Sequence, residues 1–140
     1  MIKNISNLGD AAVYCDFGSE VNETINSNVI NYFNNLTDLV KKEKIKGINN
    51  LTPSYNKLII SFDLSITNFL KLKEIIENLN IDENTKKENK NIKIPVCCDD
   101  EYGLDFDRLN HKLNLSKEEI LNFFFNKEYF CYMTGFIAGM

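Results

Sequence analysis

The chain has 140 residues, a formal net charge of −4 and a hydrophobic fraction of 44%. This length holds one ordinary domain or two small ones, and the apolar content is enough for a core, which excludes a disordered protein. Acidic and basic side chains are mixed along the chain, whereas a nucleic-acid partner favours basic residues gathered on one face. We therefore expect no nucleic-acid partner.

The N-terminal stretch 1–9 is polar and contains no apolar run, so it resembles neither a signal peptide nor a transit peptide. No segment approaches the roughly 20 apolar residues that a membrane helix needs. Four cysteines occur outside any C-x-x-C motif: Cys15, Cys97, Cys98 and Cys131. These features predict a cytoplasmic protein with reduced, mostly buried thiols and no metal site.

The N-terminal third of the chain predicts a strand pair followed by a helix. Apolar residues alternate over Ala11–Phe17, which is typical of a strand with one buried face, and Ile2–Ile5 is a candidate partner. From Ser19 apolar residues recur every three or four positions, at Val21, Ile25, Val29, Phe33, Leu36 and Val40. Ser19 or Asn22 is predicted to cap this helix, and the charged run 41–46 to end it.

The next elements complete a small sheet with two helices. Ile45–Leu51 and Lys57–Phe62 have the pattern of strands joined by a turn at Pro53–Asn56. Ser65 is predicted to open a second helix with an apolar stripe of Ile66, Phe69, Leu70, Ile76 and Leu79. The order strand, helix, strand, strand, helix indicates an α+β domain over residues 1–80 that buries both helices on one sheet face.

A polar segment separates this domain from the rest of the chain. Asp82–Lys90 contains no apolar residue, so residues 81–90 are predicted to be a solvated linker. Beyond it, Ile92–Cys97 and Tyr129–Thr134 are predicted strands. Between them Asp105 can cap a short helix, and Ser116–Glu119 has the sequence of a capping box at the start of another.

Three features of the C-terminal part are candidates for chemistry, each with a structural alternative. The acidic turn Asp99–Glu101 suits a hard cation, although a solvated turn is favoured. His111 is the only histidine, and its surroundings favour a surface role over a catalytic relay. The segment Gly135–Gly139 predicts an anion-binding nest or, equally, a plain turn. Phosphate-loop and dinucleotide fingerprints are missing, and the catalytic residues stay unknown.

Several short motifs follow one another at characteristic spacings. They are Leu8–Ala12, Asp16–Gly18, Pro53–Leu58, Ile94–Val96, Glu101–Phe106, Leu115–Ile120, Glu128–Tyr129, Gly135–Phe136 and Gly139. Together they resemble the family of B-type 5-oxoprolinase subunits, also called allophanate hydrolase subunit 1 or KipI-like sporulation-kinase inhibitors, which is built from a carboxyltransferase C/D-type domain. The chain departs from the family pattern at Asp99, Asp100, Phe124, Ala138 and Met140.

This resemblance implies a fold and an activity. Residues 91–140 would be the opening, incomplete part of a cyclophilin-like β-rich domain. The chain would be one subunit of an ATP-dependent 5-oxoprolinase, which uses ATP with Mg²⁺ and partner subunits to open 5-oxoproline to L-glutamate. Substrate or nucleotide binding would fall to Glu101, Tyr102, Gly103, Tyr129, Gly135, Phe136 and Gly139.

Two further functions are compatible with the resemblance. Members of the family also act as inhibitors that bind a sensor histidine kinase. A degenerate subunit, kept as a structural partner, is favoured by the substitutions at Phe124, Ala138 and Met140. In each case we expect a chain that is truncated in its C-terminal domain, inactive alone and dependent on a partner.

Overall fold

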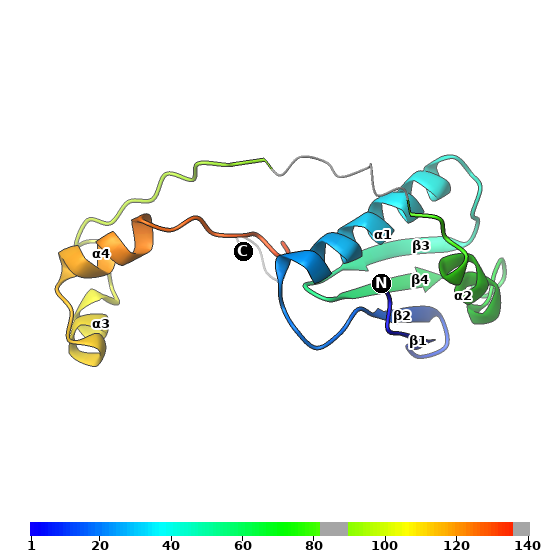
Figure 1. The fold of residues 1–140 in the computed structure, drawn as a ribbon, viewed down its shortest axis with the longest axis horizontal. Coiled ribbons are helices and arrows are strands. Elements are labelled where there is room, and N and C mark those ends of the chain that lie inside the picture. Colours follow the sequence, from blue (N-terminus) through cyan, green and yellow to red (C-terminus); the bar gives the residue numbers. More distant parts are fainter. Residues whose placement is uncertain (82–89, 136–140) are drawn as a thin grey trace. The chain divides into compact units, whose positions relative to one another are not determined.

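A computed structural model of the chain describes residues 1–81 and 90–135 (Figure 1). The chain divides into two compact units. The first unit contains residues 1–87 and 131–140, and the second contains residues 88–130. Residues 82–89 of the predicted linker lie outside the described residues, so the boundaries at residues 80 and 91 stay a prediction.

The first unit is built on a four-stranded sheet. Its strands are β1 (Asn4–Asn7), β2 (Ala12–Asp16), β3 (Ile48–Pro53) and β4 (Lys57–Phe62), in the order β1-β2-β4-β3. Every neighbouring pair is antiparallel. The four predicted strands are therefore found. β1 and β3 each begin later than the predicted Ile2 and Ile45, and β3 runs on to Pro53, which was expected in the turn. Pro53 is tolerated there because β3 is an edge strand and needs fewer ladder donors.

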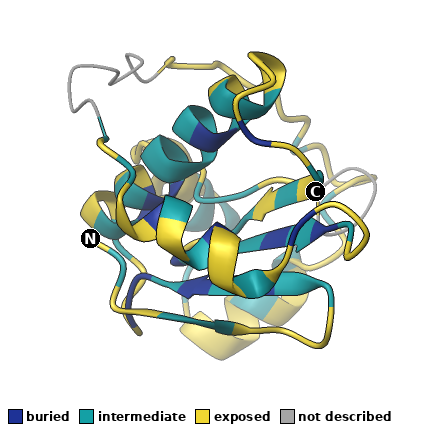
Figure 2. Cartoon of the chain, turned by 90° about the vertical axis from the view of Figure 1, so that its right-hand side faces the viewer, coloured by how far each residue is buried: buried dark blue, intermediate teal, exposed yellow. Residues whose placement is uncertain are grey.

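One face of the sheet carries the core. The strand register places Val13 opposite Ile60 and Cys15 opposite Leu58, and all four side chains are fully buried. Since side chains alternate along a strand, these four share one face. Seven more buried apolar residues join them: Phe17, Val29, Leu36, Ile45, Phe62, Leu72 and Ile76. Figure 2 shows the buried positions in dark blue on the strands and helices.

Two helices cover this face. α1 (Glu23–Lys41) starts after Asn22, whose side chain accepts a hydrogen bond of 2.9 Å from the backbone N–H of Ile25. α2 is shorter (Phe69–Glu77). The buried apolar side chains of both helices belong to the same core cluster as the sheet. The prediction that both helices pack on one sheet face is confirmed.

The predicted start of α2 is wrong by several residues. Asp63 accepts hydrogen bonds from the backbone N–H and the hydroxyl of Ser65, which closes a separate turn. The helix therefore begins only after Asn68, which caps it. Ile66 and Leu70, both expected on the apolar stripe, are 55% and 74% exposed. The stripe instead follows the core residues Leu72 and Ile76.

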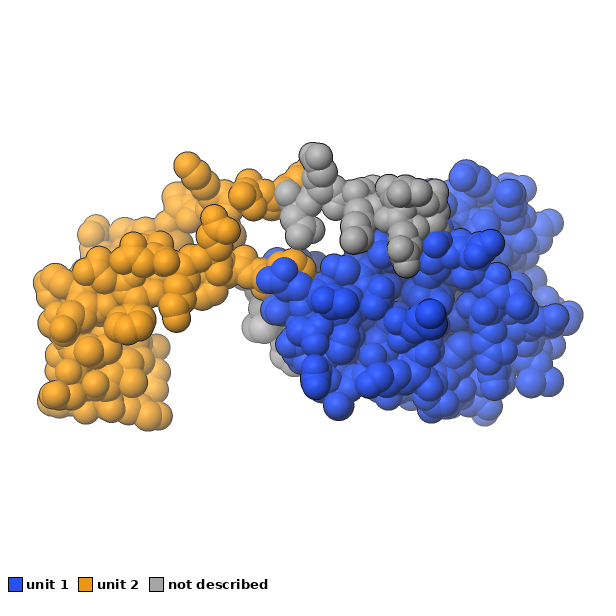
Figure 3. All heavy atoms as spheres, in the orientation of Figure 1, with its two compact units in different colours: residues 1–87, 131–140 blue, residues 88–130 orange. Residues whose placement is uncertain are grey.

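The second unit, coloured orange in Figure 3, contains two short helices, α3 (Phe106–Leu113) and α4 (Lys117–Phe125). The predicted capping box at α4 is confirmed. The Ser116 hydroxyl accepts from the Glu119 N–H at 3.2 Å, and the Glu119 carboxylate accepts from the Ser116 N–H at 2.7 Å. None of the helices in the described part of the chain is long and apolar enough to cross a membrane.

Two expectations for the second half of the chain are wrong. Asp105 precedes α3 but makes no capping hydrogen bond, because its carboxylate accepts from the Arg108 side chain at 2.9 Å. The segments 92–97 and 129–134 form no strand within the described residues. Ile92 and Ile94 are 77% and 76% exposed, since no neighbouring strand in the described residues pairs with this segment. The α+β class itself is confirmed.

Candidate functional site

The predicted site residues are distributed over both units. Four of them, Glu101, Tyr102, Gly103 and Tyr129, lie in the second unit. Gly135 belongs to the first unit, whereas Phe136 and Gly139 lie outside the described residues. The structure therefore brings together Glu101, Tyr102 and Gly103 in one turn. Tyr129 and Gly135 lie in other segments, apart from this turn in the sequence.

The acidic turn is closed by internal contacts. The Asp99 carbonyl accepts hydrogen bonds from the N–H groups of Tyr102 and Gly103, at 2.9 and 3.0 Å. The Asp100 carboxylate pairs with the Lys117 ammonium, which lowers the pKa of Asp100 and raises the pKa of Lys117. One of the three acids is thus already neutralised. Glu101 is exposed and free to meet solvent.

Metal ligands do not gather in this turn or elsewhere in the described residues. Over ranges 1–81 and 90–135, no group of three His, Cys, Asp or Glu side chains is close enough to hold an ion. His111 is exposed on α3. The acidic turn is held by the bonds to the Asp99 carbonyl and by the Asp100–Lys117 pair.

Gly103 and Tyr129 have structural contacts. A Cβ atom at Gly103 would overlap the ring of Phe106, so packing against the start of α3 requires a glycine there. The Tyr129 hydroxyl donates a 3.0 Å hydrogen bond to the Phe124 carbonyl, one of the carbonyls that α4 leaves unpaired at its end. The Tyr129 ring also lies 5.6 Å from the Phe124 ring. Both residues thus stabilise the α3–α4 region.

Gly135 has a different character. Its φ of +87° is a conformation that glycine enters without steric cost. Apart from its two chain neighbours, no residue has an atom within 4 Å of a Cβ built on it, so the space beside its backbone is open. A positive φ and open space are what close approach of a ligand to the backbone requires. Among the described candidates, Gly135 has the geometry that best fits ligand contact.

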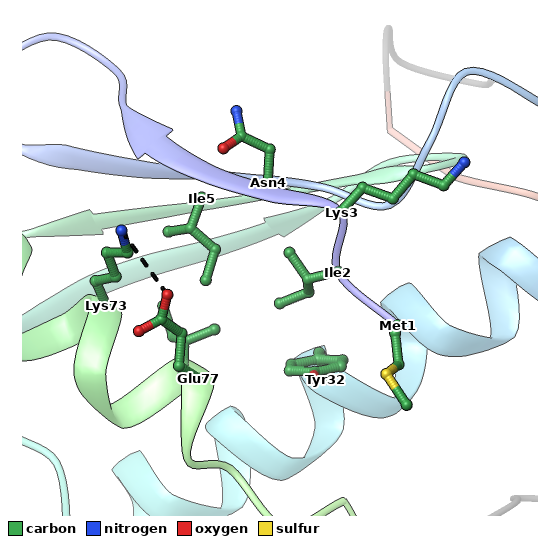
Figure 4. Close-up of a pocket in the computed structure, with 9 residues that line it drawn as sticks. Met1, Ile2, Lys3, Asn4, Ile5, Tyr32, Lys73 and Glu77 are labelled. Carbon is green, nitrogen blue, oxygen red and sulfur yellow. Dashed lines mark ion pairs between the residues drawn. The ribbon is translucent and has the colours of Figure 1, made fainter.

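The sequence did not indicate a cavity of about 300 Å³ in the first unit. It is lined by Met1, Ile2, Lys3, Asn4, Ile5, Tyr32, Lys73, Ile76 and Glu77. In Figure 4, Ile2, Ile5 and Tyr32 point toward the gap, whereas Lys3 and Asn4 point away from it. Burial raises the pKa of Tyr32, and Lys73 pairs with Glu77 at 3.8 Å. The lining therefore combines apolar side chains with an ion pair at one side.

An ionic cluster closes the end of β2. The Asp16 carboxylate accepts from the Lys57 ammonium and, at 2.7 Å, from the Gly18 N–H. Lys57 also donates to the Gly18 carbonyl at 2.5 Å. The hydrogen bond from Lys57, followed by that from Gly18, holds the pKa of Asp16 below its usual value of 3.8. Every charge in the cluster has a partner, which indicates a structural role.

Two buried amides were missed by the sequence analysis. Asn56 donates to the Glu20 carbonyl at 3.0 Å and fixes the β3–β4 turn to the segment before α1. Asn26 is 2% exposed on α1 and donates to the carbonyls of Ser54, Tyr55 and Tyr132. The sequence did contain a signal for the burial of Asn26. It precedes Val29 by three residues and so lies on the core face of the helix.

Known proteins and one family model are similar to this chain along most of its length. The family model described as carboxyltransferase domain, subdomain C and D, matches residues 3–140. The B-type subunit of 5-oxoprolinase from Bacillus subtilis (strain 168) is 28% identical over an aligned length of 147, and the alignment covers 96% of this chain and 60% of that protein. A crystal structure of a conserved uncharacterized protein from Pyrococcus horikoshii is 25% identical, with a TM-score of 0.47 and the same coverage of 96% and 60%.

The chain therefore spans 60% of the length of the curated relative that it matches. The family match contains both described units, the ionic cluster at Asp16 and the open backbone at Gly135. It also confirms the resemblance inferred from the motifs. This chain belongs to the family of carboxyltransferase domains of the subdomain C and D type.

Proposed function

We propose that this chain is one subunit of an ATP-dependent 5-oxoprolinase, which opens 5-oxoproline to L-glutamate together with partner subunits. The observation that carries the proposal is the similarity to a protein named as a 5-oxoprolinase subunit along 96% of the chain. The four free cysteines suit a reducing compartment, so we include the cytoplasm in the proposal.

The proposed reaction needs activation because a lactam carbonyl is a poor electrophile. ATP would transfer its γ-phosphoryl group to the carbonyl oxygen and release ADP. Water would then add to the carbon, and the ring C–N bond would break with a proton passing to the nitrogen. A second water would hydrolyse the resulting acyl phosphate to L-glutamate and phosphate. ATP with Mg²⁺ is the co-substrate of the assembled enzyme in this proposal. The described residues form no cluster of three metal-binding side chains, so we assign them no step with the nucleotide.

The part of this chain that we assign to ligand contact is the backbone at Gly135, with Phe136 and Gly139 following from the family resemblance. Fixed N–H donors stabilise the negative charge that develops on a carbonyl oxygen under attack. Gly135 supports this assignment through its positive φ and the open space beside it. Glu101 and Tyr102 are exposed and are proposed as contacts with the ligand or with a partner subunit.

The test is to produce the chain with its partner subunits and to measure 5-oxoproline-dependent phosphate release from ATP. We expect copurification and turnover for the complex, and no turnover for the chain alone. Gly135→Ala should lower turnover about tenfold or more if the backbone there contacts the ligand. Alanine keeps the N–H group but is strained at a φ of +87°, so the donor would shift from its position. Gly9→Ala is a matched control, because Gly9 also has a positive φ and open space.

Two outcomes would overturn the proposal. One is a copurifying complex that releases no phosphate in response to 5-oxoproline. The other is a chain that ignores the partner subunits and instead binds a sensor histidine kinase and blocks its autophosphorylation. Equal turnover of the Gly135→Ala and Gly9→Ala complexes would remove Gly135 from the site and leave the assignment to the enzyme complex standing.

A further inference from the structure

Asn26 is a polar residue on the buried face of α1. Its side chain is 2% exposed, and its Nδ2 atom lies 2.9 Å from the Tyr132 carbonyl oxygen and 3.0 Å from that of Tyr55. The Ser54 carbonyl oxygen is farther, at 3.3 Å. An amide nitrogen carries two hydrogens, so the two shorter contacts are its principal bonds.

The orientation of this amide follows from its neighbours. All three surrounding partners are carbonyl oxygens, which accept hydrogen bonds and cannot donate them. Only the nitrogen end of the amide can face them, because the oxygen end would meet three acceptors with no hydrogen between. A buried polar group is costly unless its hydrogen bonds are made, so the bonds to Tyr55 and Tyr132 stabilise one arrangement of these segments.

The two principal partners come from distant parts of the chain. Tyr55 lies in the β3–β4 turn, which Asn56 also ties to the Glu20 carbonyl. Tyr132 lies 106 residues after Asn26 and three residues before Gly135. Both segments belong to the first unit. The amide therefore joins the start of α1, a sheet turn and the segment that leads into Gly135.

We propose that Asn26 is a positioning residue, whose amide anchors the Tyr132 carbonyl to the first unit and so sets the direction in which the chain enters Gly135. The anchor itself depends only on the contacts of the first unit. Its consequence for ligand binding at Gly135 rests on the proposed function. An apolar residue at this position would fill the space on α1 and leave the carbonyls of Tyr55 and Tyr132 without this donor.

The anchor can be measured in the whole 140-residue chain by nuclear magnetic resonance, with no ligand or partner. We expect nuclear Overhauser effects from the Asn26 side-chain amide protons to the backbone protons of Tyr132 and Met133. We also expect ¹⁵N order parameters near 0.85 at Met133, as in rigid backbone, which should fall below about 0.6 in Asn26→Asp. Aspartate keeps the shape of asparagine but places an oxygen against the carbonyls.

Asn35→Asp is the matched control. Asn35 is on the same helix and donates to the Asn31 carbonyl at 2.9 Å, within α1. It should leave the order parameter at Met133 unchanged. If Asn26→Asp unfolds the first unit, the spectra of the wild-type chain provide the test. Cross-peaks from the Asn26 side-chain amide to Tyr132 support the anchor. Their absence, together with a mobile Met133, overturns it. A folded Asn26→Asp with a rigid Met133 also overturns it.

Activity gives a separate readout in the complex with partner subunits. A small displacement of a positioned group can cost about a hundredfold in rate, so Asn26→Asp should lower turnover by that order while copurification persists. The magnetic resonance test and the activity test can fail independently of each other. A missing anchor leaves the phosphate assay of the wild-type complex as it was, and a complex without 5-oxoproline turnover leaves the cross-peaks of the isolated chain intact.

Discussion

The two units of the chain differ in what holds their helices in place. In the first unit, eleven apolar residues from strands, helices and the segments between them are buried in one cluster. In the second unit, neither α3 nor α4 has a buried residue. Phe123 of α4 is 63% exposed, although phenylalanine is among the residues most often buried in proteins.

This difference shows that the position of a helix and the stability of a helix have different causes. The α4 capping box specifies where the helix starts, using groups only three residues apart. Isolated helices shorter than about 12–15 residues are marginal in water, and α3 and α4 have 8 and 9 residues. Local signals therefore place these helices, whereas apolar burial stabilises the first unit.

The largest contrast is expected in thiol reactivity. Burial raises the pKa of Cys15 from 9.0 to about 12, which lowers its reactive thiolate about a thousandfold near neutral pH. In native protein at pH 8, iodoacetamide should modify the exposed Cys97 of the second unit much faster than the buried Cys15, as measured by peptide mass spectrometry. In urea the two rates should converge. Similar rates in native protein would show that the first unit opens readily.

The next largest contrast between the units is expected from truncating one large side chain in each of them. Ile60→Ala removes a fully buried side chain from β4 and should lower the free energy of unfolding by about 2–5 kcal/mol. Phe123→Ala removes a larger but mostly exposed side chain and should change it by less than about 0.5 kcal/mol. Urea denaturation followed by circular dichroism measures both.

The Phe123→Ala variant is the control for side-chain volume. If it lowered the denaturation midpoint as much as Ile60→Ala does, the second unit would share the cooperative core of the first. That result would contradict the comparison of the two units.

The smallest effect is expected at the helix starts of the second unit. Ser116→Ala removes the capping box of α4 and should destabilise that helix by about 0.5–2 kcal/mol. Asp105→Ala is the control, because Asp105 makes no capping hydrogen bond at α3. The ¹³Cα chemical shifts of each helix report the loss. Equal losses in the two variants would mean that the capping geometry does not stabilise α4.

Much of the first unit could be predicted because its signals are periodic. The alternation around Val13 and Cys15 and the spacing of Val29 and Leu36 state which face is buried, and the core contains these residues. The start of α2 could not be predicted in the same way. A side-chain turn at Asp63 competes with the helix there, and only the packed unit shows which of the two forms.

The candidate site was less accessible to prediction. The glycine at position 135 indicated a special backbone conformation, and its φ is positive. The contacts of Tyr129 and Gly103 with the α3–α4 region were not apparent, since each depends on how one ring meets the end or start of a helix. Asp100 was placed in an acidic turn, but its pairing with Lys117 spans 17 residues.

By itself the sequence determined the family, the α+β class, the four strands of the first unit and the capping box of α4. These depend on motif order, on period and on groups close together along the chain. The tertiary structure alone decided the partners of Asn26, which lie 28, 29 and 106 residues away. No local pattern encodes such contacts, because a buried amide finds its acceptors only after distant segments have packed around it.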